Sequence, residues 1–154
     1  MAESIRSDPG EICLLAIGPL TNVAELFSRH PDVPEQLGGL MMMAGAFRSG
    51  AGKGEWNEWN VRCDPEAAVV VYGTAAHIHR SVGLNVTTRV QLEAEAVQAR
   101  CQHDRWRPAL DMSEVWFRER PVTMFHDPLA AAAPVSYTHL RAHETKTRLA
   151  GGGL

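Results

Sequence analysis

Two short segments carry the polar side chains that are the best candidates for chemistry in this sequence. His126 stands directly before Asp127, and histidine is the side chain best suited to proton transfer near neutral pH. The Asp127 carboxylate can ligate a metal ion, although it could instead cap a helix that continues through Pro128. Glu58 and Asn60 are two residues apart in a polar stretch, so one bend could direct both at a single ligand, or both could be solvated.

Apolar runs predict the strands that must position these residues. Residues 12–17 form a continuous apolar run, which is typical of a strand buried on both faces of a parallel sheet. A second run, residues 40–43, ends before Ala44-Gly45, and residues 78–84 are a third, less apolar candidate. Residues 47–63 then form a polar, glycine-rich loop after the second strand, where α/β proteins usually place their sites.

Helices are expected between these strands. Thr21 or Asn22 can cap a helix that continues to about His30. Asp64 is a good N-cap for a second helix, with Pro65 at its first position. A further helical stretch is expected from residue 89 to about residue 118. The alternation predicts an α/β fold with a mostly parallel central sheet flanked by helices.

Composition excludes several classes of protein. The chain has 154 residues, which suits one domain, and a net charge of −3 offers no electrostatic footprint for nucleic acid. The three cysteines are odd in number and have no zinc-site spacing, so a reduced compartment is expected. No early apolar run is long enough for a signal peptide or a membrane span. We therefore predict a cytoplasmic protein without nucleic-acid or membrane partners.

Four motifs, in order, resemble the nucleoside hydrolase family of the inosine–uridine-preferring type. They are AIGPLTN at residues 16–22, MAGAF at 43–47, EWN at 58–60 leading to DPEAA at 64–68, and HDP at 126–128. The resemblance covers residues 8–134 and implies a truncated Rossmann-like nucleoside hydrolase fold. It also implies cleavage of the N-glycosidic bond of a ribonucleoside to give ribose and a free nucleobase, as in purine and pyrimidine nucleoside catabolism.

The resemblance also assigns roles to single residues. Asp127 matches a Ca²⁺ ligand that also contacts ribose, and Ile17 matches a position whose backbone carbonyl binds Ca²⁺, with a place in the strand core as the alternative. Glu58 and Asn60 match a pair that hydrogen-bonds ribose hydroxyls.

Two further positions match the region around the nucleobase. His126 matches a histidine that protonates the leaving base, unless it only lines the pocket. Met43 matches a methionine that lines the nucleoside pocket, with core packing as the alternative.

The sequence also departs from the family pattern. The amino-terminal D-x-D-x-x-x-D-D motif, which supplies the general base and most Ca²⁺ ligands, is absent. Residues 52–54 read Gly-Lys-Gly where an asparagine is common, and Asn85 stands where an aspartate is usual. We therefore expect a fragment that is inactive as written, from a parent that forms dimers or tetramers. The alternative is a non-catalytic nucleoside-binding or interaction domain of the same fold.

The carboxyl-terminal segment resembles foreign sequence. Residues 135–145 read VSYTHLRAHET, which is similar to the in-frame translation of a sequencing-library adapter. We therefore predict a partial nucleoside hydrolase domain at residues 1–134 and a non-native tail at 135–154.

Overall fold

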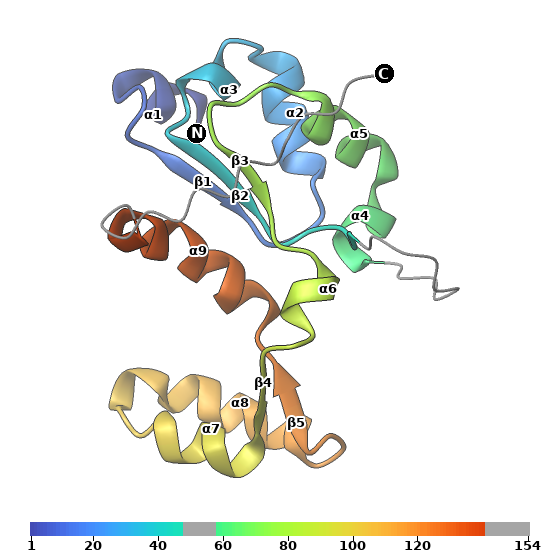
Figure 1. The fold of residues 1–154 in the computed structure, drawn as a ribbon, viewed down its shortest axis with the longest axis vertical. Coiled ribbons are helices and arrows are strands. Elements are labelled where there is room, and N and C mark those ends of the chain that lie inside the picture. The colour runs from blue at the N-terminus through green and yellow to red at the C-terminus, as the bar shows by residue number, and fades with distance from the viewer. Residues whose placement is uncertain (48–57, 141–154) are drawn as a thin grey trace.

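A parallel sheet of three strands forms the centre of the molecule. The computed structural model describes residues 1–47 and 58–140 (Figure 1). The sheet order is β1 (Cys13–Ala16), β2 (Gly39–Met42) and β3 (His79–Ser81), with Leu14 opposite Leu40 and Leu40 opposite His79. This confirms the predicted α/β fold, although the third strand is shorter than the run at residues 78–84.

Helices cover this sheet. On one side, α2 (Thr21–Arg29) and α5 (Pro65–Gly73) pack against each other, and α9 (His126–Leu140) contacts β1 and β2 from the other side (Figure 1). The remaining helices are α1 (Ala2–Ser7), α3 (Val33–Gln36), α4 (Trp59–Cys63), α6 (Leu84–Thr87), α7 (Ala94–Arg100), a 3₁₀ turn (Asp104–Trp106) and α8 (Arg107–Phe117). Among the described residues, no helix has the length and apolar character needed to cross a membrane.

The core lies between β1, β2 and the two helices α2 and α5. The buried stripe of α2 has the three- and four-residue spacing that an amphipathic helix requires. It consists of Val23, Ala24, Leu26 and Phe27. Leu40 and Met42 of β2 are fully buried, as is Val71 of α5. Burial of these apolar side chains holds the helices on the sheet.

Asp64 joins two of the helices. As predicted, it is the N-cap of α5, and its carboxylate accepts a 3.0 Å hydrogen bond from the backbone N–H of Ala67. The same carboxylate accepts a 2.5 Å hydrogen bond from the hydroxyl of Thr21. The Thr21 bond, followed by the Ala67 bond, lowers the pKa of Asp64 below its ordinary value. The prediction that Thr21 or Asn22 caps α2 was wrong: Leu20 holds that position without a side-chain bond.

Strand β1 is not buried on both faces. Cys13 and Leu15 are exposed, whereas Ala16 is buried, so successive side chains alternate between the two faces. In the described part of the chain β1 pairs with β2 alone, which leaves β1 at the edge of the sheet. The expected burial was therefore wrong, because it depends on neighbours that a local apolar run does not specify.

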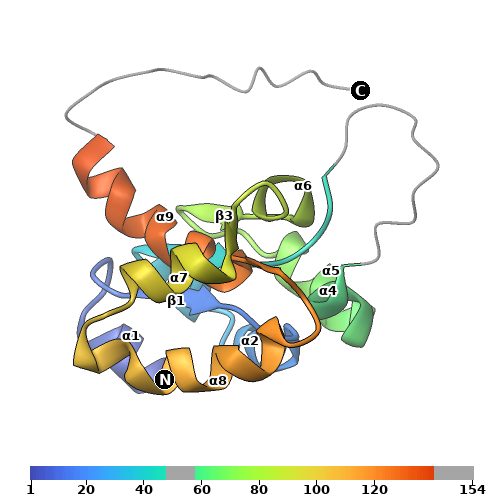
Figure 2. The same ribbon diagram turned by 90° about the horizontal axis from the view of Figure 1, so that it is seen from below.

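A second, smaller sheet interrupts the helical stretch expected at residues 89–118. Strand β4 (Gln91–Glu93) pairs antiparallel with β5 (Val122–Met124), with Leu92 opposite Thr123. Helices α7 and α8 lie between these strands in the sequence, and the chain leaves the helical conformation between them at Cys101–His103. Figure 1 shows α7 and α8 beside each other at the end of the molecule away from α2 and α5, and Figure 2 shows the same elements from below.

Helix α9 crosses the domain boundary predicted at residue 134. It continues to Leu140, and residues 141–154 lie outside the described part of the chain. The division into a domain and a foreign tail therefore stays a prediction.

His79 of β3 is the ionisable group whose burial should link stability to pH. Its ring stacks on Tyr72, with the centroids 5.8 Å apart and the planes at 20°. Its Nε2 atom is buried and has no hydrogen-bond partner among the described residues. Burial lowers the pKa of His79, and a hydrogen bond to the backbone of Thr74 opposes that shift only in part.

We predict that the free energy of unfolding falls as the pH decreases from about 7 through the ordinary histidine pKa of about 6.5. In this range the unfolded chain binds a proton at His79 that the folded chain resists, so acid favours unfolding. Urea unfolding at several pH values measures the slope. His79→Phe keeps the stacked ring and should flatten it, whereas His77→Gln, at an exposed site, should not. Equal slopes in both variants would contradict the prediction.

Candidate active site

The candidate site begins where parallel strands end. Ile17 directly follows β1 and Met43 directly follows β2, and the Met43 N–H donates a 2.9 Å hydrogen bond to the Ala16 carbonyl. Met43 is 3% exposed, whereas the Ile17 side chain is 46% exposed and so is not part of the core. The carboxyl ends of parallel strands are where α/β proteins bind ligands.

Glu58 is buried at the amino terminus of α4. It is 5% exposed, so it does not belong to a solvated polar loop. Its carboxylate accepts hydrogen bonds from three backbone N–H groups, those of Asn60 at 2.8 Å, Val61 at 2.9 Å and Gly45 at 3.0 Å. Buried carboxylates require such partners, because an unpaired charge in the interior is costly. Glu58 therefore caps α4 and fastens it to the segment after β2.

Asn60 extends this connection to the end of β2. Its side-chain amide donates a 2.8 Å hydrogen bond to the Met43 carbonyl, and the same nitrogen lies 3.8 Å from the Met43 sulfur. Asn60 is 7% exposed. The structure thus brings together three predicted site residues, Met43, Glu58 and Asn60. That these residues contact substrate, and that Glu58 and Asn60 hydrogen-bond ribose hydroxyls, stays a prediction.

Glycines allow a close approach between the segment after β2 and the start of α6. Gly45 has a φ of +79°, a conformation that residues with a Cβ rarely adopt. Its carbonyl accepts a 2.9 Å hydrogen bond from the Leu84 N–H, and a Cβ on Gly83 would lie 2.8 Å from the same oxygen. Asn85, at the position where the family usually has aspartate, accepts a 3.1 Å hydrogen bond from the Phe47 N–H. Asn85 therefore has a structural role here.

His126 and Asp127 lie in the first turn of α9. The helix begins at His126, so Asp127 is inside it, and the alternative that Asp127 is its N-cap was wrong. A carboxylate in the first turn is favoured by the helix dipole. The Nδ1 atom of His126 lies 2.7 Å from the hydroxyl oxygen of Thr87 at the end of α6. Thr87 is a residue that the sequence analysis did not single out.

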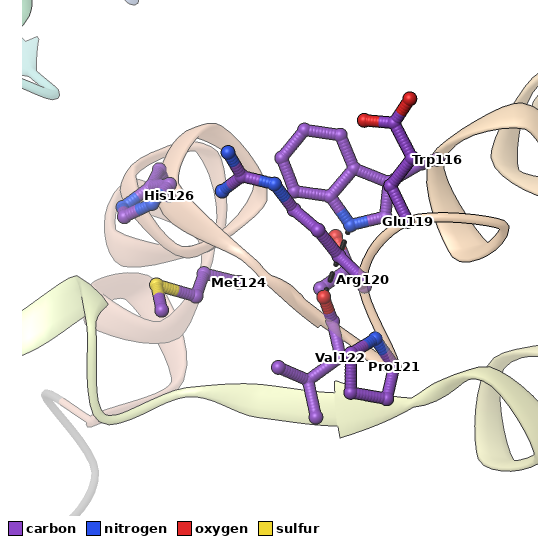
Figure 3. A pocket seen from close by; sticks show the side chains of 8 residues that line it. Trp116, Glu119, Arg120, Pro121, Val122, Met124 and His126 are labelled. Atoms are coloured by element: carbon purple, nitrogen blue, oxygen red, sulfur yellow. Dashed lines mark hydrogen bonds between the residues drawn. The ribbon is translucent and has the colours of Figure 1, made fainter.

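A pocket of about 560 Å³ lies beside His126. Its walls come from the end of α8, from β5 and from the start of α9, and they include Trp116, Arg120, Val122 and Met124. Figure 3 shows Trp116 on one side of the pocket and His126 with Met124 on the other. The indole N–H of Trp116 donates a 3.0 Å hydrogen bond to the Val122 carbonyl, and the Arg120 guanidinium lies 4.8 Å from the indole centroid. The pocket thus joins a histidine to an aromatic wall with a cation against it.

Comparison with known protein families identifies the family of this chain. The family model described as "Inosine-uridine preferring nucleoside hydrolase" matches residues 1–152. The chain belongs to this nucleoside hydrolase family.

Two similar proteins have pyrimidine or uridine in their names. The chain is 36% identical over 98 residues to the pyrimidine-specific ribonucleoside hydrolase RihA of Citrobacter koseri, covering 62% of this chain and 30% of the relative. It is 37% identical over 90 residues to probable uridine nucleosidase 1 of Oryza sativa subsp. japonica, covering 58% of this chain and 28% of the relative. The alignments therefore span about a third or less of these relatives.

Solved nucleoside hydrolase structures have the same fold. The plant nucleoside hydrolase PpNRh1 superimposes with a TM-score of 0.76 at 27% identity, over 89% of this chain and 45% of that chain. The purine-preferring ribonucleoside hydrolase of Gardnerella vaginalis has a TM-score of 0.77 at 23% identity, over 89% of this chain and 46% of that chain, which supports the fold alone. This nucleoside hydrolase chain thus spans about half of each solved structure.

The described residues do not complete a calcium site. No three histidine, cysteine, aspartate or glutamate side chains in residues 1–47 and 58–140 are grouped so that they could hold a metal ion. The resemblance predicts two ligands in this chain, Asp127 and the Ile17 carbonyl. Ca²⁺ takes six to eight oxygens. The Gly-Lys-Gly segment at residues 52–54 lies outside the described residues.

We predict that Glu58→Gln destabilises the chain by ~1–3 kcal/mol, because the new amide group turns a donor toward one of three backbone N–H groups. Urea unfolding measures the loss. The matched control is Glu11→Gln, which makes the same chemical change at an exposed loop position and should leave stability nearly unchanged. Similar stabilities for the two variants would show that the Glu58 carboxylate does not hold the strand end.

Proposed function

We propose that this chain carries part of the active site of a ribonucleoside hydrolase, an enzyme that releases ribose and a free nucleobase. Membership of the nucleoside hydrolase family supports this proposal. The observation that carries it is the position of His126, which borders a pocket walled by Trp116 and Arg120. A pocket with an aromatic wall and a proton donor suits a departing heterocyclic base.

The reaction requires a proton at the leaving base. As the bond between the ribosyl carbon and the base nitrogen breaks, its electron pair goes to the base and positive charge develops on the sugar. In the proposal, His126 donates a proton to the base as that bond breaks. Water adds to the ribosyl carbon and gives a proton to the general base, which the resemblance places in the D-x-D-x-x-x-D-D motif, and exchange with solvent returns a proton to His126. Atoms balance, since one water is consumed for each nucleoside cleaved.

The sugar would be held by the residues at the strand ends. Asp127 is half-buried, and its carboxylate can accept hydrogen bonds from ribose hydroxyls. An ionised carboxylate has about four acceptor positions, so Glu58, with three already used, can accept at most one more hydrogen bond. Glu58 would then act mainly by fixing Asn60, whose amide holds the Met43 carbonyl in place.

Calcium is part of the proposal only through the family resemblance. Asp127 and the Ile17 carbonyl would supply two of its oxygens, and the remaining ligands would come from outside the described residues.

Uridine is the first substrate to test, because the curated relatives have pyrimidine or uridine in their names. Cytoplasmic location and assembly as a dimer or tetramer are likewise proposals.

The purified chain alone should not hydrolyse uridine or inosine, even with millimolar Ca²⁺. One carboxylate and one carbonyl cannot replace a six- to eight-oxygen ligand set. Release of reducing sugar measures turnover. The control is a longer protein that joins this chain to the D-x-D-x-x-x-D-D segment of a family member, which should be active. Turnover by the chain alone would show that the catalytic residues and metal ligands have been assigned to the wrong positions. Binding without turnover in the longer protein would favour the non-catalytic alternative.

In an active form of the protein, His126→Ala should slow uridine cleavage by about 10²–10⁴-fold, the usual contribution of general acid–base catalysis. A nitrophenyl riboside should be much less affected, because its leaving group departs without a proton. The ratio of kcat/KM values for the two substrates separates proton donation from binding. If both substrates slow equally, His126 only lines the pocket.

A further inference from the structure

Thr87 makes a buried contact with the proposed proton donor. It is 0% exposed at the end of α6, and its hydroxyl oxygen lies 2.7 Å from Nδ1 of His126. The two residues are 39 positions apart in the sequence. At this distance the pair forms a hydrogen bond of ordinary length.

The direction of this hydrogen bond follows from the burial of the hydroxyl. A threonine hydroxyl has one proton to donate, and buried donors are almost always paired. The neighbouring Thr88 directs its hydroxyl to the Leu84 carbonyl, but among the described residues the Thr87 hydroxyl has His126 Nδ1 as its one hydrogen-bond partner. The Thr87 hydroxyl therefore donates to Nδ1. In neutral His126 the ring proton is then on Nε2.

We propose that Thr87 is a positioning residue that fixes the tautomer and the ring orientation of His126. With Nδ1 held by Thr87, Nε2 is the nitrogen that can serve a ligand in the adjoining pocket (Figure 3). The catalytic consequence rests on the proposed function, because it requires His126 to protonate the leaving base. The tautomer itself does not depend on that function.

Backbone hydrogen bonds connect the segment that carries Thr87 to the segment that carries His126. The Thr87 N–H bonds to the Gly83 carbonyl at 3.1 Å, and the Thr87 carbonyl accepts from Val90 at 3.1 Å. The Val90 carbonyl in turn accepts a 3.0 Å hydrogen bond from Phe125, the residue before His126. Three successive bonds thus connect the chain on both sides of the contact. A hydroxyl held in this way suits an orienting role, since it needs no large motion to keep the ring in place.

Nitrogen NMR of the purified chain tests the tautomer without any need for activity. Histidine is labelled with ¹⁵N, and the His126 ring signals are assigned by their loss in His126→Gln. At about pH 8.5 histidine rings are neutral, so the shifts report tautomers. The native chain should show a protonated Nε2 and a hydrogen-bonded, unprotonated Nδ1. Thr87→Val, which removes the hydroxyl but keeps the shape, should shift the Nδ1 signal and populate the other tautomer.

Two controls separate this effect from general disturbance of the fold. Thr87→Ser retains the hydroxyl and should restore the native ring shifts even if it lowers the melting temperature. Thr88→Val removes a hydroxyl from the next residue, which bonds to Leu84 rather than to His126, and should leave the His126 signals unchanged. A protonated Nδ1 in the native chain, or unchanged shifts in Thr87→Val, would overturn the proposal.

In an active form of the protein, Thr87→Val should lower kcat for uridine by roughly tenfold with a smaller change in KM, and Thr87→Ser should recover most of it. A nitrophenyl riboside should be less affected. If the Thr87 variants change the His126 ring signals as expected but His126→Ala keeps full activity, the proton-donor function is refuted and the positioning contact stands. If His126→Ala is inactive but Thr87→Val leaves the His126 ring shifts unchanged, the positioning role alone is refuted.

Discussion

The buried carboxylate of Glu58 is the interaction on which the geometry of the strand ends depends. A charged group at 5% exposure is tolerated only when hydrogen bonds replace its lost hydration. The three N–H groups that do so come from two segments, Gly45 after β2 and the first residues of α4. Satisfying one charge therefore fixes α4 against the end of β2. Asn60, the second residue of α4, can then reach the Met43 carbonyl.

A second carboxylate fixes the other end of α4. Asp64 directly follows this helix and caps α5, and it also accepts a hydrogen bond from Thr21 at the start of α2. Glu58 thus connects α4 to the sheet, and Asp64 connects it to the helices that cover the sheet. Because α4 has only five residues, its own backbone bonds would not stabilise it in isolation. Its position follows from these two flanking acids, so the motif around residues 58–64 has a structural role.

Local signals predicted the elements whose determinants are local. The start of helix α5 was predicted, because Asp64 and Pro65 are adjacent and act on the first turn itself. The buried stripe of α2 likewise follows from its own periodicity. Strands β4 and β5 escaped prediction because each has three residues, and the pairing between them joins segments about thirty residues apart. The exposure of Leu15 depends on which strands adjoin β1, which no property of residues 12–17 can specify.

Sequence motifs predicted several residues of the candidate site but not the contacts between distant segments. Met43, Glu58 and Asn60 were chosen from motifs, and the structure places them in contact. Their motifs did not indicate that the Glu58 carboxylate would be occupied by backbone, since that requires the glycine turn at Gly45 to approach it. Thr87 gave no signal of its own, because its partner is on a different element and Thr88 beside it has the same side chain.

The position of His126 depends on the small sheet as well as on the contacts of α9 with β1 and β2. After Val90 the chain leaves through β4, forms α7 and α8, and returns through β5, and the antiparallel pairing brings Phe125 back to Val90. Closing such an excursion costs entropy, which the pairing and the packing of α7 must offset, since α8 contributes no buried residue. The contact between Thr87 and His126 lies where this excursion rejoins the domain. It therefore couples the histidine to α6, whose first residue bonds to Gly45, the same glycine that Glu58 holds. His126 and the strand ends are thus connected through Gly45, so a substitution of that glycine would disturb both.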